Sequence, residues 1–311
     1  MSSPDLSPPR VPVSRLAVLL GERFAASGAS GARIELESRE EIVEDAGFSF
    51  VVRVLSDRIA IAAARAKAEA ATLSRSVAAA GREGAAVPSP STTAVRSPFL
   101  PPYDPALLLG AITDTHVALL NKYNLVDRHL LIVTRELEQQ EAPLTAADFE
   151  AARLCLDGID GLVFYNSGAA AGASQSHKHL QLVPFPLGPR GERFPLDRAI
   201  AAAVAAGLDV VPRLAYRHRV ALLGAGSSLA TDHAVYGELL AAVTPALPAP
   251  YNLLMTRDWM LVVPRTRASE GPIDVNALGF AGTLVARRAG DLEWLRSIGP
   301  MEVLRRVTIT R

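Results

Sequence analysis

The stretch GASQSHKHLQLVPFP, at positions 172–186, decides the fold and site predictions for this chain. Its middle part predicts a β-strand over 177–183, which the prolines that follow would end. Alternate side chains of a strand point to one face, so His177, His179 and Gln181 are expected to project together. Two imidazoles and an amide in one row are costly to bury, and they therefore predict a functional site on this strand.

A segment of small residues, NSGAAAGASQS, precedes the strand at positions 166–176. Glycines let the backbone approach an anion closely, and amide N–H groups with short polar side chains can hold phosphate oxygens. The candidate phosphate-binding residues of this segment are Asn166, Gly168, Ser174 and Gln175. A neutral imidazole next to a phosphate site can attack phosphorus and form a covalent phosphoramidate. Because an imidazole with a pKa of about 6.5 is largely neutral at about pH 7, this attack needs no special tuning.

Zinc is the alternative ligand for two histidines at this spacing. A catalytic zinc usually needs a third His, Asp, Glu or Cys ligand, and the sequence offers none nearby, so no metal ligands are predicted. Cys155 is the only cysteine, which excludes an internal disulfide and a multi-cysteine metal site and fits a reducing cytoplasm. His116, His218 and His233 stand without partners in the sequence and are expected to be structural or surface residues.

Composition places the chain among globular proteins and limits its partners. It has 311 residues, of which 49% are hydrophobic and 21% charged, enough apolar material for a packed core. Lys and Arg number 32 and Asp and Glu 32, so the net charge is zero, which argues against nucleic acid or a polybasic membrane contact. We also expect no apolar run of the roughly 20 residues that span a bilayer. These features predict a cytoplasmic protein without a nucleic-acid or membrane partner, whose oligomeric state the sequence leaves open.

Short β-type runs and helical segments follow one another without regular alternation, which predicts an α+β fold. The other expected strands lie at 34–37, 48–55, 115–120, 130–134, 162–165, 214–222 and 251–263. The expected helices lie at 14–26, capped by Ser14, at 145–156, opened by a capping box of Thr145 with Asp148, and at 196–206 and 232–243. Residues 60–80 are alanine-rich and compatible with a helix, whereas 81–98 are expected to form a mobile loop.

Two stretches resemble each other and suggest an internal repeat. NKYNLVDRHLLIVTR at 121–135 and YNLLMTRDWMLVVPR at 251–265 share Tyr-Asn-Leu, a short polar turn, an apolar strand and a final arginine. A degenerate duplication would produce such a pair.

The segment at 172–186 resembles the His-x-His-x-Gln signature of the nucleotidyltransferase branch of the histidine-triad (HIT) superfamily. Further stretches are similar to the diadenosine tetraphosphate phosphorylases, also called ATP adenylyltransferases: PFLPPYDP at 98–105, NKYNLVDRHLLIVTRELE at 121–138, FYNSGAAAG at 164–172 and YNLLMTRDWMLVVPR at 251–265. The resemblance implies a HIT-like antiparallel sheet flanked by helices. It implies a catalytic region over 1–190 and an ATP adenylyltransferase region over 191–311, which is the candidate degenerate repeat.

The resemblance also implies a role for each residue of the motif. His179 would be the nucleophile that attacks the α-phosphate, and His177 would hydrogen-bond and orient it. Gln181 would replace the third histidine of the hydrolase branches and donate to a phosphate oxygen. A neutral amide is a poor general acid or base toward water, so the intermediate could survive until a phosphate acceptor arrives.

Other candidate nucleotide contacts lie outside the motif. Asn166, Gly168, Ser174 and Gln175 match the phosphate-contacting loop of the family, His129 matches a position that shapes the site, and Lys122 and Arg96 complete the set. Arg96 stands where relatives often carry lysine, and the two side chains differ in geometry. Arg265, like Lys122, could contact phosphates, but a charged residue at a strand end is usually solvated, and this is the expectation for Arg265.

The implied reaction is phosphorolysis of diadenosine 5′,5‴-P1,P4-tetraphosphate to ATP and ADP, and its reverse, through a covalent adenylyl-histidine. Mg²⁺ or another divalent cation would be bound mainly through the substrate phosphates. The expected partners are diadenosine polyphosphates, ATP, ADP and phosphate. One alternative is a nucleotidyltransferase for another nucleotide, such as an ADP sulfurylase, a sugar-nucleotide phosphorylase or a hexose-1-phosphate uridylyltransferase. An alternative of another class is a nucleotide-binding regulator without turnover.

Overall fold

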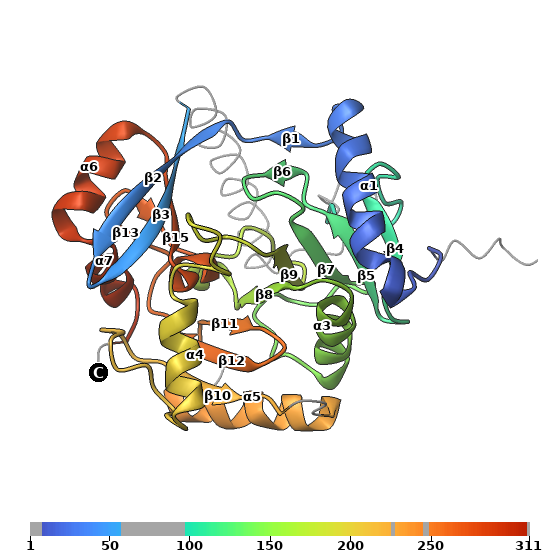
Figure 1. Cartoon of the computed structure of the whole chain (residues 1–311). Helices are drawn as coiled ribbons and strands as arrows, with labels where there is room; N and C mark the ends of the chain where they lie inside the picture. Colours follow the sequence, from blue (N-terminus) through green and yellow to red (C-terminus); the bar gives the residue numbers. More distant parts are fainter. Residues whose placement is uncertain (1–7, 57–96, 225–227, 245–248, 310–311) are drawn as a thin grey trace, which may run out of the picture.

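An eight-stranded sheet forms the centre of the chain (Figure 1). The computed structural model describes residues 8–56, 97–224, 228–244 and 249–309. The strand order is β10-β12-β11-β8-β9-β7-β5-β4, and every neighbouring pair is antiparallel. The strands are β4 (Leu108–Ala111), β5 (His116–Leu120), β7 (Leu130–Thr134), β8 (Gly161–Asn166), β9 (His179–Pro184), β10 (Arg219–Leu222), β11 (Tyr251–Met255) and β12 (Trp259–Pro264). The prediction of an α+β fold with an antiparallel sheet is confirmed.

A smaller three-stranded sheet joins the two ends of the chain. The strands β2 (Ser38–Asp45) and β3 (Phe48–Leu55) form an antiparallel hairpin, and β15 (Thr283–Ala286) adds to β3 in parallel. Two further pairs are short: β1 (Ile34–Glu35) with β6 (Tyr123–Asn124), and β13 (Ser269–Glu270) with β14 (Ile273–Asp274). In Figure 1 the smaller sheet lies at the upper left of the larger one, next to α6 (Ala289–Ile298) and α7 (Pro300–Arg306).

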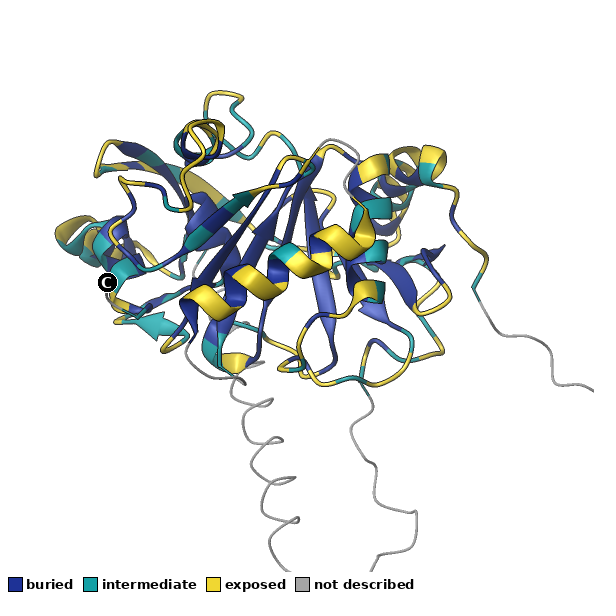
Figure 2. Cartoon of the chain, turned by 90° about the horizontal axis from the view of Figure 1, so that it is seen from below, coloured by how far each residue is buried: buried dark blue, intermediate teal, exposed yellow. Residues whose placement is uncertain are grey.

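Helices cover one face of the large sheet because alternate apolar side chains of its strands point there. These helices are α1 (Leu16–Ala29), α3 (Ala146–Gly158) and α5 (Leu229–Val243). They bury Val163 of β8 and Leu180 and Leu182 of β9. Figure 2 shows α5 lying across the strands, with its exposed side turned outward.

The opposite face is covered in two separate parts. At one end, Phe164 belongs to a core shared with the small sheet, α4 (Asp197–Ala205), α6 and α7. At the other end, Phe99 packs on side chains of β5 and β7. Between these parts lies β9, where His179 is paired with a β7 residue and Gln181 is paired with Phe164. The site predicted from the sequence therefore lies between two hydrophobic clusters.

Of the two helix caps predicted from the sequence, the structure contains one. Thr145 and Asp148 form the expected capping box at the start of α3. Ser14 does not cap α1, because it lies in a short 3₁₀ turn (Val13–Arg15) and the helix begins at Leu16 without a side-chain cap. Other 3₁₀ turns lie at Ala169–Ala171 and Ala277–Ala281.

The strand expected from 214 requires correction, because it begins only at Arg219. The stretch 251–263 forms a hairpin of β11 and β12, with the short polar turn between the two strands. The two similar stretches agree in their second strands, β7 and β12, which both lie in the large sheet. Their Tyr-Asn-Leu ends differ, because Tyr123 pairs with β1 outside that sheet whereas Tyr251 begins β11 within it.

Three predictions fall wholly or largely outside the described residues: the helix at 60–80, most of the loop at 81–98, and Arg96. Within the described ranges, no helix is long and apolar enough to cross a bilayer. The large sheet is continuous across the expected region boundary at 190, since β10, β11 and β12 join strands from the first region.

Candidate active site

His179 and Gln181 lie on one face of β9, where the site is, and Leu180 and Leu182 point to the other face, which the helices cover. His177 lies just before β9, joined to Gln139 by an isolated antiparallel bridge, so the strand begins two residues later than expected. His177, His179 and Gln181 are all at least nine-tenths buried.

The protonation form of His179 follows from one hydrogen bond. Its Nδ1 lies 2.8 Å from the carbonyl oxygen of His177. A carbonyl can only accept, so Nδ1 carries the proton and Nε2 keeps a free lone pair. Burial, the largest influence, lowers the pKa of His179 from 6.5 to about 4. The ring is therefore neutral near pH 7, with Nε2 as the atom available to attack phosphorus.

His177 orients His179 through its main chain rather than its ring. The His177 ring donates from Nε2 to the carbonyl oxygen of Thr134 at 2.9 Å. Its Nδ1 accepts from the hydroxyl of Ser97, also at 2.9 Å. Phe99 packs against both imidazoles, with ring centroids 5.9 Å from that of His177 and 5.1 Å from that of His179. Both rings are thus held by hydrogen bonds and by one aromatic neighbour.

The neutral form of His179 is expected to persist on acidification to about pH 5, because the lowered pKa means that the ring gains its second proton only near pH 4. Nitrogen-edited NMR of the imidazole would measure this, with the spectrum of His179→Gln assigning the signal. A titration midpoint near the ordinary value of about 6.5 would contradict the buried, Nδ1-protonated geometry.

Asn166 ends β8 close to His179. Continuing the register of β8 and β9 by two positions places Asn166 opposite His179. The Asn166 Oδ1 accepts from Asn252 Nδ2 and from the backbone N–H of Ala277, each at 2.8 Å. Its oxygen is therefore occupied, and its amide NH₂ is the group left to donate to a ligand.

The loop that follows Asn166 turns tightly at two glycines. Gly168 has φ +81°, and a Cβ there would lie 2.7 Å from the Glu141 side chain. Gly172 has φ +93°, and a Cβ there would lie 2.6 Å from a backbone oxygen. Ser174 and Gln175 follow as exposed residues whose backbone N–H groups make no hydrogen bond to another described residue. These groups are free to donate to an anion.

Arg265 is buried and donates a hydrogen bond to this loop, contrary to the expectation that it is solvated. It is 2% exposed, and its Nη1 donates to Asn252 Oδ1 at 2.5 Å and to the carbonyl of Ala171 at 3.1 Å. Asn252 in turn donates to Asn166. Burial lowers the pKa of Arg265 to about 9, so the guanidinium remains charged near pH 7. The sequence did not reveal this relay because its members come from distant parts of the chain.

His129 lies beside the site, immediately before β7. Its Nδ1 accepts from Asn121 Nδ2 at 3.1 Å, and its ring lies 5.7 Å from that of Phe164. Burial lowers the pKa of His129 to about 4, and Gln181 and His179 are near enough to influence it. The structure therefore brings together the predicted residues His129, His177, His179, Gln181 and Asn166.

Lys122 is the described candidate that the structure does not place with the histidines. It is exposed between β5 and β6, and its side chain makes no hydrogen bond or ion pair with another described residue. Of the other histidines, His116 and His218 are buried in structural contacts and His233 is exposed, as expected.

Lys178 has a structural role that the sequence did not reveal. It lies between the two site histidines, points to the opposite face and is fully buried. Its Nζ is 2.7 Å from Asp148 Oδ2 and 3.1 Å from Glu138 Oε2, and Asp148 Oδ1 is 3.0 Å from His116 Nε2. Burial alone would raise the pKa of Asp148, but His116 and Lys178 together lower it to about 2. This buried network ties the histidine strand to α3.

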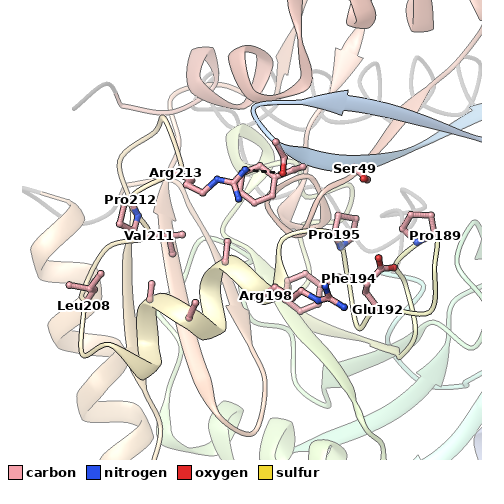
Figure 3. A pocket seen from close by; sticks show the side chains of 15 residues that line it. Ser49, Pro189, Glu192, Phe194, Pro195, Arg198, Leu208, Val211, Pro212 and Arg213 are labelled. Carbon is pink, nitrogen blue, oxygen red and sulfur yellow. Dashed lines mark hydrogen bonds between the residues drawn. The ribbon is translucent and has the colours of Figure 1, made fainter.

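Two cavities differ in their relation to the site. One of about 490 Å³ has walls from Asn124 to Arg128, just before His129, and from Pro184 to Leu187, at the end of β9. Another of about 540 Å³ lies between α4 and the β2–β3 turn and contains none of the predicted site residues (Figure 3). Its walls are largely apolar and also include Glu192, Arg198 and Arg213 (Figure 3). Neither of these two cavities has a site histidine in its walls, but the first is lined by the residues that lead directly to His129.

Comparisons with known proteins show which family the sequence matches. The family model of the Ap4A phosphorylase N-terminal domain matches residues 10–202, and that of the ATP adenylyltransferase C-terminal domain matches 212–310. Diadenosine 5′,5‴-P1,P4-tetraphosphate phosphorylase 2 of Saccharomyces cerevisiae is 29% identical over 210 residues, which are 56% of this chain and 63% of that protein. Protein APA1 of the same yeast is 29% identical over 208 residues, 57% of this chain and 63% of that protein. The alignments thus span less than two thirds of either relative.

Solved structures show the same fold. The crystal structure of yeast Ap4A phosphorylase Apa2 in complex with AMP is similar with a TM-score of 0.73 at 23% identity, covering 96% of this chain and 98% of that one. The complex of Apa2 with Ap4A gives the same TM-score and coverage at 21% identity.

Proposed function

This chain belongs to the Ap4A phosphorylase family, and from that premise we propose that it converts diadenosine tetraphosphate and phosphate into ATP and ADP, and catalyses the reverse adenylyl transfer. The observation that supports this most strongly is the neutral His179, whose Nε2 is free while its Nδ1 is fixed by the His177 carbonyl. This is the arrangement that nucleophilic attack on phosphorus needs.

In the first step, Nε2 of His179 attacks the α-phosphorus of one adenylyl group. A P–N bond forms, the P–O bond to the other phosphates breaks, and ATP leaves. The ring then carries a positive charge, because its Nδ1 keeps its proton. The carbonyl oxygen of His177, 2.8 Å from Nδ1, stabilises that charge.

In the second step, an oxygen of inorganic phosphate attacks the same phosphorus. The P–N bond breaks, ADP forms, and His179 returns to its neutral form. Two in-line displacements give net retention of configuration at phosphorus. The Gln181 amide donates to a phosphate oxygen but cannot activate water as a base, so phosphate rather than water completes the reaction.

The loop after β8 and a divalent cation would together stabilise the negative charge of the substrate phosphates. The NH₂ of Asn166 and the N–H groups of Ser174 and Gln175 can donate to phosphate oxygens. Among the described residues, no three or more His, Cys, Asp or Glu side chains are grouped to hold a metal ion. Mg²⁺, or another divalent cation, would be bound mainly through the substrate phosphates, where it would stabilise the leaving ATP.

Nucleotides and phosphate are the partners that this reaction requires. A lone buried cysteine, Cys155, supports a location in the reducing cytoplasm.

Product analysis tests the proposed function. The protein is incubated with diadenosine tetraphosphate, Mg²⁺ and phosphate, and the products are separated by ion exchange. Equal amounts of ATP and ADP, formed only when phosphate is present, are expected. Two ADP would indicate a symmetric hydrolase, and tight binding without turnover would indicate a regulator. Faster turnover of adenosine phosphosulfate or a sugar nucleotide would assign a different substrate; each of these results contradicts the proposal.

A further inference from the structure

The pairing of β8 with β9 stops where the site begins. Four residue pairs join these strands, and the last is Phe164 with Gln181. Two positions further, His179 and Asn166 stand opposite each other without a direct ladder bond. The strands have separated at the level of the nucleophile and of the first residue of the phosphate loop.

The side chain of Gln140 fills this gap. Its Oε1 accepts from the backbone N–H of His179 at 2.9 Å. Its Nε2 donates to the carbonyl of His179 at 3.1 Å and to the carbonyl of Asn166 at 2.9 Å. The amide thus replaces the ladder bonds with both of its hydrogens and its oxygen, and Gln140 is fully buried.

Gln140 is itself fixed at both of its main-chain groups. Its N–H donates to the carbonyl of Ser176 at 2.8 Å, where the phosphate loop ends. Its carbonyl accepts from the hydroxyl of Tyr165, the neighbour of Asn166 on β8. One residue therefore contacts the nucleophile and both ends of the phosphate loop.

We propose that Gln140 is a positioning residue that sets the separation between His179 and the phosphate loop through its side-chain amide. The proposal rests on the proposed function, because that separation decides how closely Nε2 approaches a bound α-phosphorus. In-line attack is sensitive to such placement, since an error of about 1 Å can cost about 100-fold in rate. Gln140 makes its contacts to the main chain, so it influences the rate through His179.

Two substitutions separate positioning from packing. Gln140→Leu has nearly the same size but leaves one N–H and two carbonyl groups without their partner. Gln140→Glu keeps the acceptor, yet its carboxylate faces two carbonyl oxygens and cannot donate to them. Gln139 is the matched control, because it is the neighbouring glutamine and is exposed.

Steady-state kinetics are the first measurement. For Gln140→Leu we expect kcat to fall by about 10- to 100-fold with KM changed by less than about twofold, because His179 is displaced while the substrate contacts remain. Gln139→Leu should stay within about twofold of the wild type in both constants. An unchanged kcat in Gln140→Leu, or a loss confined to KM, would overturn the proposal.

The pH dependence of Gln140→Glu gives a readout that loss of packing would not produce. A protonated carboxyl has one O–H donor and one C=O acceptor, so it restores part of the amide pattern. The ratio of its kcat to that of the wild type should rise as the pH is lowered from about 9 to about 5.5, while the ratio for Gln140→Leu stays low and constant. A constant ratio for Gln140→Glu would count against the role of the amide.

A measurement without substrate tests the positioning role of Gln140 independently of the proposed phosphorylase activity. The NMR signal of the His179 Nδ1–H should shift or broaden in Gln140→Leu and stay in place in Gln139→Leu. If the wild type forms no ATP and ADP, the proposed function fails. An unchanged His179 signal in Gln140→Leu overturns the positioning role whatever reaction the protein performs.

Discussion

Replacing His179 by glycine is expected to lower the turnover of diadenosine tetraphosphate by at least about 10⁴-fold, because it removes the Nε2 atom that attacks phosphorus. The same change should remove the covalent intermediate. Protein incubated with substrate labelled at the α-phosphate, without inorganic phosphate, should carry the label in the wild type. An adenylyl group on an imidazole nitrogen should be released by acid and retained in base.

The control is His233→Gly, which removes an exposed histidine on α5. This variant should be labelled like the wild type and turn over at a similar rate. Label that persists in His179→Gly, with the same sensitivity to acid, would contradict the assignment of His179 as the nucleophile.

Lys178→Met is expected to have the largest effect on stability. The ammonium group of Lys178 is fully buried between Asp148 and Glu138. Its loss leaves the buried carboxylate of Asp148 with only two side-chain partners among the described residues, His116 and the capping residue Thr145. Removing one partner of a buried ion pair costs about 3–5 kcal/mol of the free energy of unfolding. Urea unfolding followed by circular dichroism measures this loss.

The matched control for this change is Lys122→Met, because Lys122 is exposed. Its free energy of unfolding should change by no more than about 0.5 kcal/mol. A loss below about 1 kcal/mol in Lys178→Met would show that the buried network contributes little. The pKa of Asp148 is lowered from 3.8 to about 2, so the stability linked to it is present above pH 3.8 and is lost as the pH falls toward 2.

The site histidines could be predicted from the sequence because the relevant rule is local. Alternation along a strand places His179 and Gln181 on one face whatever the rest of the chain does. The capping box of Thr145 with Asp148 is local in the same way and was also correct. For these features, the neighbours that decide the geometry are a few residues away.

The supports of the site could not be predicted, because their partners are distant in sequence. Gln140 reaches across to β8 and β9, and Asn252 and Arg265 come from a part of the chain about 90 residues beyond Asn166. Arg265 looks like an ordinary charged strand end until the register of β11 and β8 places Asn252 next to Asn166. The parallel addition of β15 to β3 has the same cause, since no local pattern specifies a partner strand so far along the chain.

The fate of labelled inorganic phosphate tests the central claim most directly. Diadenosine tetraphosphate is incubated with the protein, Mg²⁺ and ³²P-phosphate, and the nucleotides are separated. Because phosphate attacks an adenylyl group already bound to His179, we expect all incorporated label in ADP, at its β-position, and an equal amount of unlabelled ATP. Label in ATP, or unlabelled ADP or AMP as the product of adenylyl release, would contradict a phosphorylase that acts through an adenylyl-histidine.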